Sequence, residues 1–255
     1  MKRDEVREHI EQAASRFNAE LHTASYAETH SDSAQLRRLL SFLSPQGKQV
    51  FLDLGTGNGY VGVALAKEHP TSHVVGVDIA EQAIEQDIEN AKRQGLSNIH
   101  FHAFDGVTLP FSDGTFDGAV CRYAFHHLPC PETTLGEMSR TLRRGARFVL
   151  ADPVRHEDDE TDFINGFQEL RRDGHVRIHR FEEFIDLASR QGFELIDWFN
   201  SSISFGRQRT QEYDELLAST PTRIRQAYAL TVAEEEIRMT FRILNAAFLN
   251  RKLGP

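Results

Sequence analysis

Cysteine is scarce in this chain: among 255 residues, only Cys121 and Cys130 carry a thiol. Two cysteines imply no disulfide framework, so the sequence predicts a reducing, cytoplasmic location. Long apolar runs are missing as well, and the charged start Met1–Glu8 is not followed by the apolar core of a signal peptide. We therefore expect a cytoplasmic protein without a membrane span.

Blocks of lysine or arginine are also missing, and the net charge is −9. This charge argues against a broad nucleic-acid-binding surface, so no nucleic-acid partner is expected. Neither internal repeats nor low-complexity linkers divide the chain, and we predict one domain over residues 1–255. The sequence leaves the oligomeric state open, a dimer included.

The stretch Val50–Gly59, VFLDLGTGNG, organises the rest of the chain. Its apolar start, broken only by Asp53, is typical of a strand buried on both faces. Three glycines then occupy alternate positions: Gly55, Gly57 and Gly59. Such glycines let the backbone turn sharply and approach a ligand closely, because no Cβ intervenes. Residues 60–67 have a helical composition, so the pattern predicts strand, glycine loop and helix, with backbone N–H groups facing a ligand.

Strand and helix patterns alternate after this loop. We expect strands at 73–77, 99–104, 116–121, 147–150 and 193–199, and helices at 80–94, 131–142 and 181–191. Two further helices, around 6–17 and 34–43, precede the loop. The alternation predicts an α/β fold with a doubly wound, mostly parallel sheet. In the tail we expect helices at 211–219 and 222–236, whereas residues 241–249 fit either a final antiparallel strand or a helix.

Three acids, Asp53, Asp78 and Asp105, stand at or beside the ends of the expected strands. Ligands of parallel sheets bind beyond the carboxyl ends of the strands, so these side chains are expected near one ligand. Asp78 follows Gly59 by 19 residues, close to the about 20 expected of an acid that binds ribose hydroxyls. Each acid alone fits a helix cap or a turn, but together with the glycine loop they favour a nucleoside ligand.

The details of the loop indicate which nucleoside. The dinucleotide fingerprint G-x-G-x-x-G fails because Tyr60 stands at the third glycine position. The Lys-Ser/Thr pair of a phosphate-binding P-loop is missing, and no basic residue lies in the loop. A nucleoside without phosphates therefore fits better than NAD or ATP.

With these features the chain resembles the class I S-adenosylmethionine-dependent methyltransferases. The resemblance is to the small-molecule group that includes the ubiquinone and menaquinone biosynthesis enzymes. The resemblance rests on VFLDLGTGNGY, VVGVDIA, FHAFDGVTLPFSDGTFDGAVCRYAFHHL and EMSRTLRRGARFVLADP. It is strong over residues 17–152 and weak after Gly206. It implies a Rossmann-like, seven-stranded sheet with N-terminal helices and a helical insertion near the C-terminus. Arg143-Arg144-Gly145-Ala146 replaces the family's frequent Lys-Pro-Gly-Gly, a turn variant that should not affect the chemistry.

The resemblance implies that S-adenosylmethionine is the cofactor and S-adenosylhomocysteine its product. The cofactor-binding residues that it implies are Asp53, Gly55, Thr56, Gly57, Gly59, Asp78, Ile79, Asp105, Gly106 and Arg122. The glycine loop would wrap the methionine portion, and Asp53 would reach its amino group. Asp78 would bind the ribose hydroxyls, while Asp105 would accept from the adenine amino group. Arg122 would contribute its backbone carbonyl, and its side chain could face the substrate pocket.

The implied reaction is methyl transfer to an oxygen, nitrogen or carbon nucleophile of a small molecule. A nucleophile that must lose a proton needs a general base, for which the candidates are His126, His127 and Tyr26. The two histidines also fit a structural role in the loop before Pro129. A zinc site that combines them with Cys121 and Cys130 matches no standard ligand spacing, so no metal is expected.

Segments outside the expected sheet are candidates for covering the site. We expect a helical cap at 1–45 and substrate lids at 153–180 and 207–238. Residues 21–32 look polar and irregular, and we expect them, with Tyr26, to fold over the ligand. The alternatives are a non-catalytic module that binds S-adenosylmethionine and an NAD-dependent oxidoreductase, which Tyr60 disfavours. The methyl acceptor cannot be read from the sequence.

Overall fold

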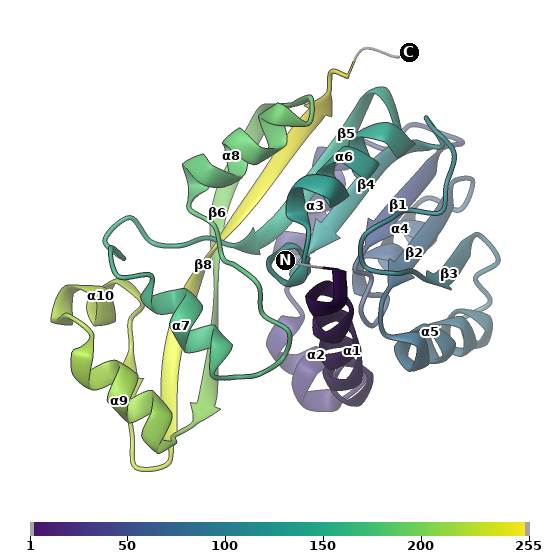
Figure 1. Ribbon diagram of the computed structural model, residues 1–255. Helices are drawn as coiled ribbons and strands as arrows, with labels where there is room; N and C mark the ends of the chain where they lie inside the picture. Colours follow the sequence, from purple (N-terminus) through teal and green to yellow (C-terminus); the bar gives the residue numbers. More distant parts are fainter. Residues whose placement is uncertain (1–2, 253–255) are drawn as a thin grey trace.

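A central sheet is the organising layer of the computed structural model, which describes residues 3–252 (Figure 1). Its strands are β1 Val50–Leu54, β2 His73–Asp78, β3 Ile99–Ala103, β4 Phe116–Arg122, β5 Leu142–Pro153, β6 Phe193–Gln208, β7 Thr231–Val232 and β8 Glu236–Asn250. The order across the sheet is β3-β2-β1-β4-β5-β8-β6, with β7 beside β8. Strands β1 to β5 are parallel, and β8 is antiparallel to β5 and β6. The predicted doubly wound, mostly parallel α/β sheet is confirmed.

Helices cover both faces of this sheet and build two apolar layers. One layer contains α3 Ser33–Leu43, α4 Tyr60–Glu68 and α5 Glu81–Arg93, and the other contains α6 Pro131–Thr141 and α8 Phe181–Arg190. β1 is apolar because it meets both layers: Phe51 packs into the first and Leu52 into the second. Burial of one such side chain contributes about 1.5–3 kcal/mol. The centre of the sheet is therefore rigid, and it holds the strand ends in fixed positions.

The N-terminal region differs from the sequence prediction in one respect. Residues 21–32, expected to be irregular, contain the helix α2 Ala24–His30, which lies beside α1 Arg3–Glu20 (Figure 1). Thr23 caps α2 by accepting a hydrogen bond from the Tyr26 backbone N–H, and Asp32 caps α3 through the N–H groups of Ala34 and Gln35. These local caps define α2 although its seven residues are too few to show an apolar period.

The C-terminal region contains a long ribbon that the sequence analysis predicted only in part. β6 continues to Gln208 and pairs with β8 as far as Glu236, beyond the end of β5. Residues 241–249 therefore form a strand, not a helix, and the predicted helix 222–236 is replaced by the shorter α10 Thr222–Ala227 followed by β7. Polar residues alternate along this ribbon, so its sequence lacks the apolar run of a central strand.

Helices pack against the far end of the β6–β8 ribbon (Figure 1). These are α7 Phe163–Glu169, α9 Gln211–Ser219 and α10. The rings of Phe167 on α7 and Tyr213 on α9 lie 4.6 Å apart, and Tyr228 and Phe241 belong to the same apolar cluster. No helix within residues 3–252 is long and apolar enough to cross a membrane.

Candidate active site

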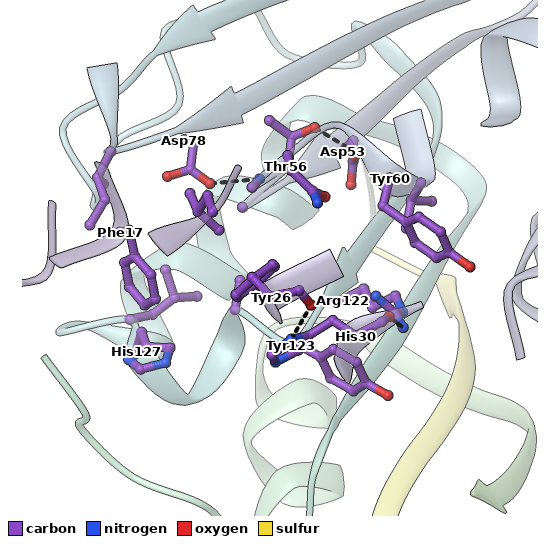
Figure 2. Close-up of a pocket in the computed structure, with 18 of the residues that line it drawn as sticks. Phe17, Tyr26, His30, Asp53, Thr56, Tyr60, Asp78, Arg122, Tyr123 and His127 are labelled. Atoms are coloured by element: carbon purple, nitrogen blue, oxygen red, sulfur yellow. Dashed lines mark hydrogen bonds between the residues drawn. The ribbon is translucent and has the colours of Figure 1, made fainter. Parts of the chain in front are cut away.

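A pocket lies where the carboxyl ends of β1, β2 and β4 meet the N-terminal helices (Figure 2). Its wall on the sheet side comes from the glycine loop and the ends of β2 and β4; α1 and α2 supply the opposite wall. Among the residues predicted for the site, the following line it: Tyr26, Asp53, Gly55, Thr56, Gly57, Asp78, Ile79, Gly106, Arg122 and His127. The topology thus gathers most of the predicted side chains in one place.

Asp53 anchors the glycine loop. Its Oδ2 accepts hydrogen bonds from Thr56 Oγ1 and from the Gly62 backbone N–H, both at 2.8 Å. Its Oδ1 has no hydrogen-bond partner within residues 3–252 and belongs to a side chain that lines the pocket. Burial raises the pKa of Asp53 to about 6. A cationic ligand group at Oδ1 would relieve this cost.

Gly55 is required at its position for two reasons. Its φ is +67°, a conformation that L side chains rarely adopt, and a Cβ would lie 2.3 Å from the Cβ of Ala124. The loop can therefore pass close to the end of β4 only with glycine here. This close approach shapes the wall of the pocket between β1 and β4.

Asp78 ends β2 and is only 7% exposed. Its Oδ2 accepts from the Gly57 backbone N–H at 2.9 Å, and its Oδ1 accepts from the Ala80 N–H at 3.0 Å. Each carboxylate oxygen can accept a further hydrogen bond, so the side chain is fixed in orientation and still able to bind hydroxyls. Burial raises the pKa of this carboxyl as well.

Three predicted site residues lie outside the lining of this pocket. Asp105 is exposed, and its Oδ1 accepts from the backbone N–H groups of Val107 and Thr108. Gly59 faces the core, where a Cβ would meet Val63, Asp87 and Phe101, and it begins α4 with φ +74°. His126 belongs to a neighbouring pocket.

Arg122 links the sheet to α2. Its Nε donates to Gln35 Oε1 at 3.0 Å, and its Nη2 donates to the His30 carbonyl at 2.5 Å. Its guanidinium lies over the rings of Tyr60 and Tyr123, with centroid distances of 4.9 and 4.1 Å. The resemblance implied a backbone contact for Arg122 and a side chain toward the substrate pocket. The sequence did not identify Gln35, because this residue lies in no motif.

Tyr123 follows β4 in a strained conformation. Its φ is +57°, which costs a non-glycine residue about 1–3 kcal/mol. The backbone N–H of Tyr123 donates to the Ala151 carbonyl at 2.7 Å, and its hydroxyl accepts from Gln35 Nε2 at 3.1 Å. These contacts hold the ring in the wall shared by the two pockets.

Aromatic side chains form the wall of the pocket opposite the loop (Figure 2). Tyr26 and His30 stack with ring centroids 4.0 Å apart, and Phe17 meets His127 edge-on at 4.9 Å. Burial raises the pKa of Tyr26 to about 12 and lowers the pKa of His127 well below its ordinary value. Tyr26 therefore remains a neutral phenol, and the lowered pKa makes the His127 imidazole a weak base, so neither is well suited to accept a proton.

A second pocket of about 710 Å³ adjoins the first and shares Phe17, Tyr26, His30, Tyr123 and His127 with it. It continues between α1 and the β6–β8 ribbon. His126 lines it and is otherwise buried, with Nδ1 3.0 Å from Asp152 Oδ1. No other hydrogen bond to this ring exists within residues 3–252. Asp152 therefore fixes the proton on Nδ1 and leaves Nε2 able to accept one.

Metal binding has no support in the arrangement of these groups. Within residues 3–252 no three His, Cys, Asp or Glu side chains are placed to share a metal ion. Cys121 is buried in the sheet, whereas Cys130 is partly exposed at the start of α6.

Comparison with known proteins gives the family. Methyltransferase domains match this chain over residues 45–191, more than half of its length. The chain belongs to this methyltransferase family. The matched region contains the glycine loop, Asp78 and the His126–Asp152 pair, but not α1, α2 or the β6–β8 ribbon.

Individual methyltransferases are similar to this one over part of their length. The uncharacterized methyltransferase YcgJ of Bacillus subtilis is 32% identical over 157 residues, which cover 60% of this chain and 61% of YcgJ. The demethylmenaquinone methyltransferase of Thermus thermophilus is 32% identical over 116 residues, covering 46% of this chain and 52% of that protein. These alignments thus span less than two thirds of either relative.

Solved structures share the fold. The crystal structure of YcgJ superposes with a TM-score of 0.75 at 23% identity, over 87% of this chain and all of that chain. A geranyl diphosphate methyltransferase in complex with SAM superposes with a TM-score of 0.62 at 20% identity, over 89% of both chains. At these identities the likeness shows the Rossmann-like methyltransferase fold alone.

Proposed function

We propose that this protein transfers a methyl group from S-adenosylmethionine to a small-molecule acceptor. The observation that carries the proposal is the first pocket, in which the family's glycine loop, Asp53 and Asp78 meet under α1 and α2. We further propose one domain over residues 1–255, with an N-terminal helical cap at 1–45 and substrate lids at 153–180 and 207–238.

The pocket fits the cofactor's chemistry group by group. Asp53 Oδ1 offers a buried, partly protonated carboxylate to the amino group of the methionine portion. Each carboxylate oxygen of Asp78 already accepts one backbone N–H and could accept a second hydrogen bond from a ribose hydroxyl. Ile79 and Gly106 line the wall beyond Asp78, where the adenine ring would lie, and Asp105 would meet its amino group at the rim. The loop contains no arginine or lysine that could bind a phosphate.

The residues that line the two pockets suggest a different role for each pocket. When bound, S-adenosylmethionine would supply an electrophilic methyl group at the junction of the pockets. The aromatic wall from α1 and α2 would exclude water there, which strengthens electrostatic interactions inside the site. The acceptor would occupy the second pocket, and positioning of this kind lowers a barrier by about 7–11 kcal/mol in favourable cases.

Among the three predicted bases, His126 is the one that the geometry favours. An acceptor hydroxyl in the second pocket would give its proton to His126 Nε2, while Asp152 stabilises the imidazolium that forms. Tyr26 and His127 would act in the wall instead, because burial keeps Tyr26 a phenol and makes the His127 imidazole a weak base. An acceptor that attacks through a neutral nitrogen would not need this base.

The open second pocket favours an enzyme over a non-catalytic cofactor-binding module, which has no use for an acceptor space of about 710 Å³. Calorimetry with S-adenosylhomocysteine and with NAD tests the cofactor. We expect binding of S-adenosylhomocysteine only, weakened roughly 10- to 100-fold in Asp78→Ala through loss of charge-assisted hydrogen bonds. The exposed Asp186→Ala serves as the matched control. Binding of NAD, or an unchanged Asp78→Ala, would refute the assignment.

A further inference from the structure

The lining of the second pocket combines two kinds of side chain. Beside Tyr123, His126 and apolar residues it contains charged side chains from α1, β6, β8 and the turn after α7. These are Arg16, Glu20, Arg171, Arg207, Glu236 and Arg238. A pocket that only shields an apolar acceptor would not need these charges.

Most of these charges already have partners. Glu20 contacts both Arg16 and Arg171, Asp173 lies 2.9 Å from Arg171, and Glu236 lies 3.0 Å from Arg238. The four arginines and two glutamates of the lining, together with the fully buried Asp173 outside the lining, leave one positive charge over.

Arg207 is the arginine of this pocket that has no carboxylate partner within residues 3–252. No carboxylate lies within 4.0 Å of its guanidinium in residues 3–252, and its only hydrogen bond goes from Nη1 to the carbonyl of Gly206 at 3.1 Å. Its Nε is buried without a partner, and the guanidinium lies 4.0 Å from the ring centroid of Phe205. Burial, followed by the neighbouring Arg171, lowers the pKa of Arg207 to about 10.

A largely buried guanidinium without an ion-pair partner costs free energy unless an anion binds beside it. Removing a charge from water carries a penalty that a paired and hydrogen-bonded partner offsets. The planar guanidinium suits a carboxylate or a phosphate, which it binds through parallel N–H groups. A carboxylate carries the single negative charge that matches the one free positive charge, whereas a phosphate dianion would leave a charge uncompensated among three carboxylates.

We infer that the methyl acceptor is a small organic acid whose carboxylate pairs with Arg207 in the second pocket. Its body is apolar or aromatic, because Phe205, Phe241 and Ile203 line the same pocket. Its nucleophile lies at the end of the molecule away from the carboxylate, beside His126. This inference rests on the proposed methyl transfer.

The test compares acids with their neutral amides on the intact protein saturated with S-adenosylhomocysteine. Calorimetry with para-hydroxybenzoate and para-hydroxycinnamate should show tighter binding than with the corresponding amides. In Arg207→Gln the affinity for the acids should fall roughly 10- to 100-fold to that of the amides, since a charge-assisted pair is lost. Arg207→Lys, which keeps the charge without the planar fork, should fall between the two.

Controls separate this inference from folding and from the proposed function. Arg209→Gln removes an exposed guanidinium held by Asp214 on the same ribbon and should bind the acids as wild type does. Unchanged affinity of Arg207→Gln for S-adenosylhomocysteine shows that the variant is folded. Failure of the wild type to bind S-adenosylhomocysteine would instead refute the proposed methyl transfer itself.

The inference is overturned if acids and amides bind equally, if none of the acids binds, or if Arg207→Gln leaves the acid affinity unchanged. Tighter binding of para-hydroxyphenyl phosphate than of either acid would also overturn it and assign Arg207 to a phosphate. Methyl transfer from labelled S-adenosylmethionine to the acids, lost in Arg207→Gln through a raised KM with kcat maintained, would support it.

Discussion

The affinity for S-adenosylhomocysteine should depend on pH through Asp53. Burial raises the pKa of this carboxyl to about 6 in the protein without ligand. An ammonium group beside Oδ1 favours the ionised form and lowers that pKa again. Ligand binding must therefore displace the proton at low pH, and the affinity should rise as the pH rises through 6.

The size of the effect follows from the titration. With a pKa of about 6, roughly nine tenths of Asp53 is protonated at pH 5 and almost none at pH 7.5. The dissociation constant should then be about 10-fold larger at pH 5 than at pH 7.5. Without ligand, the folding stability changes with pH in the opposite direction. The contribution of Asp53 to the free energy of unfolding is fully present below its unfolded-state pKa and is lost as the pH rises through about 6.

Calorimetry across this pH range with two ligands measures the effect. Methylthioadenosine has the ribose and adenine but no amino group, so it reports on Asp78 without the ammonium partner of Asp53. Only S-adenosylhomocysteine should show the extra slope, and Asp53→Asn should abolish it. A flat affinity for S-adenosylhomocysteine, or the same slope for both ligands, would show that Asp53 does not meet the amino group.

Three further predictions concern the loop, the cap and the core. Gly55→Ala should lose cofactor binding because its Cβ would lie 2.3 Å from that of Ala124, whereas Gly47→Ala, with a similar φ of +69° and nothing within 4 Å, should bind normally in calorimetry. S-adenosylhomocysteine should protect residues 21–32 in limited proteolysis, and equal cleavage with and without it would count against a closing cap. Burial, aided by neighbouring carboxylates, raises the pKa of Asp87 to about 8; stability should therefore fall as the pH rises from 4 to 8, by up to about 1.4 kcal/mol per unit. Asp87→Asn should flatten that slope in thermal melts.

The residues around the first pocket were predictable because their signals are local. The glycine loop and Asp53 lie within one strand–turn–helix unit, and Asp78 lies at the end of the next strand. Positive φ values and close backbone approach require glycine, and the ends of buried strands are recognisable where an apolar run stops. The parallel topology then brings these ends together, so that a one-dimensional pattern predicts a three-dimensional pocket.

The second pocket was not predictable in the same way. Gln35 meets Tyr123 and Asn245, partners 88 and 210 residues away. Arg207 is notable because a partner is missing, and no spacing in the sequence reveals a missing ion pair. The end of β6 was missed because its polar residues alternate with partly buried ones, and a two-stranded ribbon needs no continuous apolar run.

The origin of the second pocket's walls has an evolutionary consequence. α1, α2 and the β6–β8 ribbon lie outside residues 45–191, the part that matches other methyltransferases, and they supply most of the second pocket. Substitutions in these terminal segments can reshape the second pocket while the glycine loop and Asp78 stay unchanged. If the second pocket holds the acceptor as proposed, substrate preference can diverge through changes in the two terminal segments alone. Chimaeras that swap residues 200–242 between relatives would then transfer acceptor choice along with the ribbon.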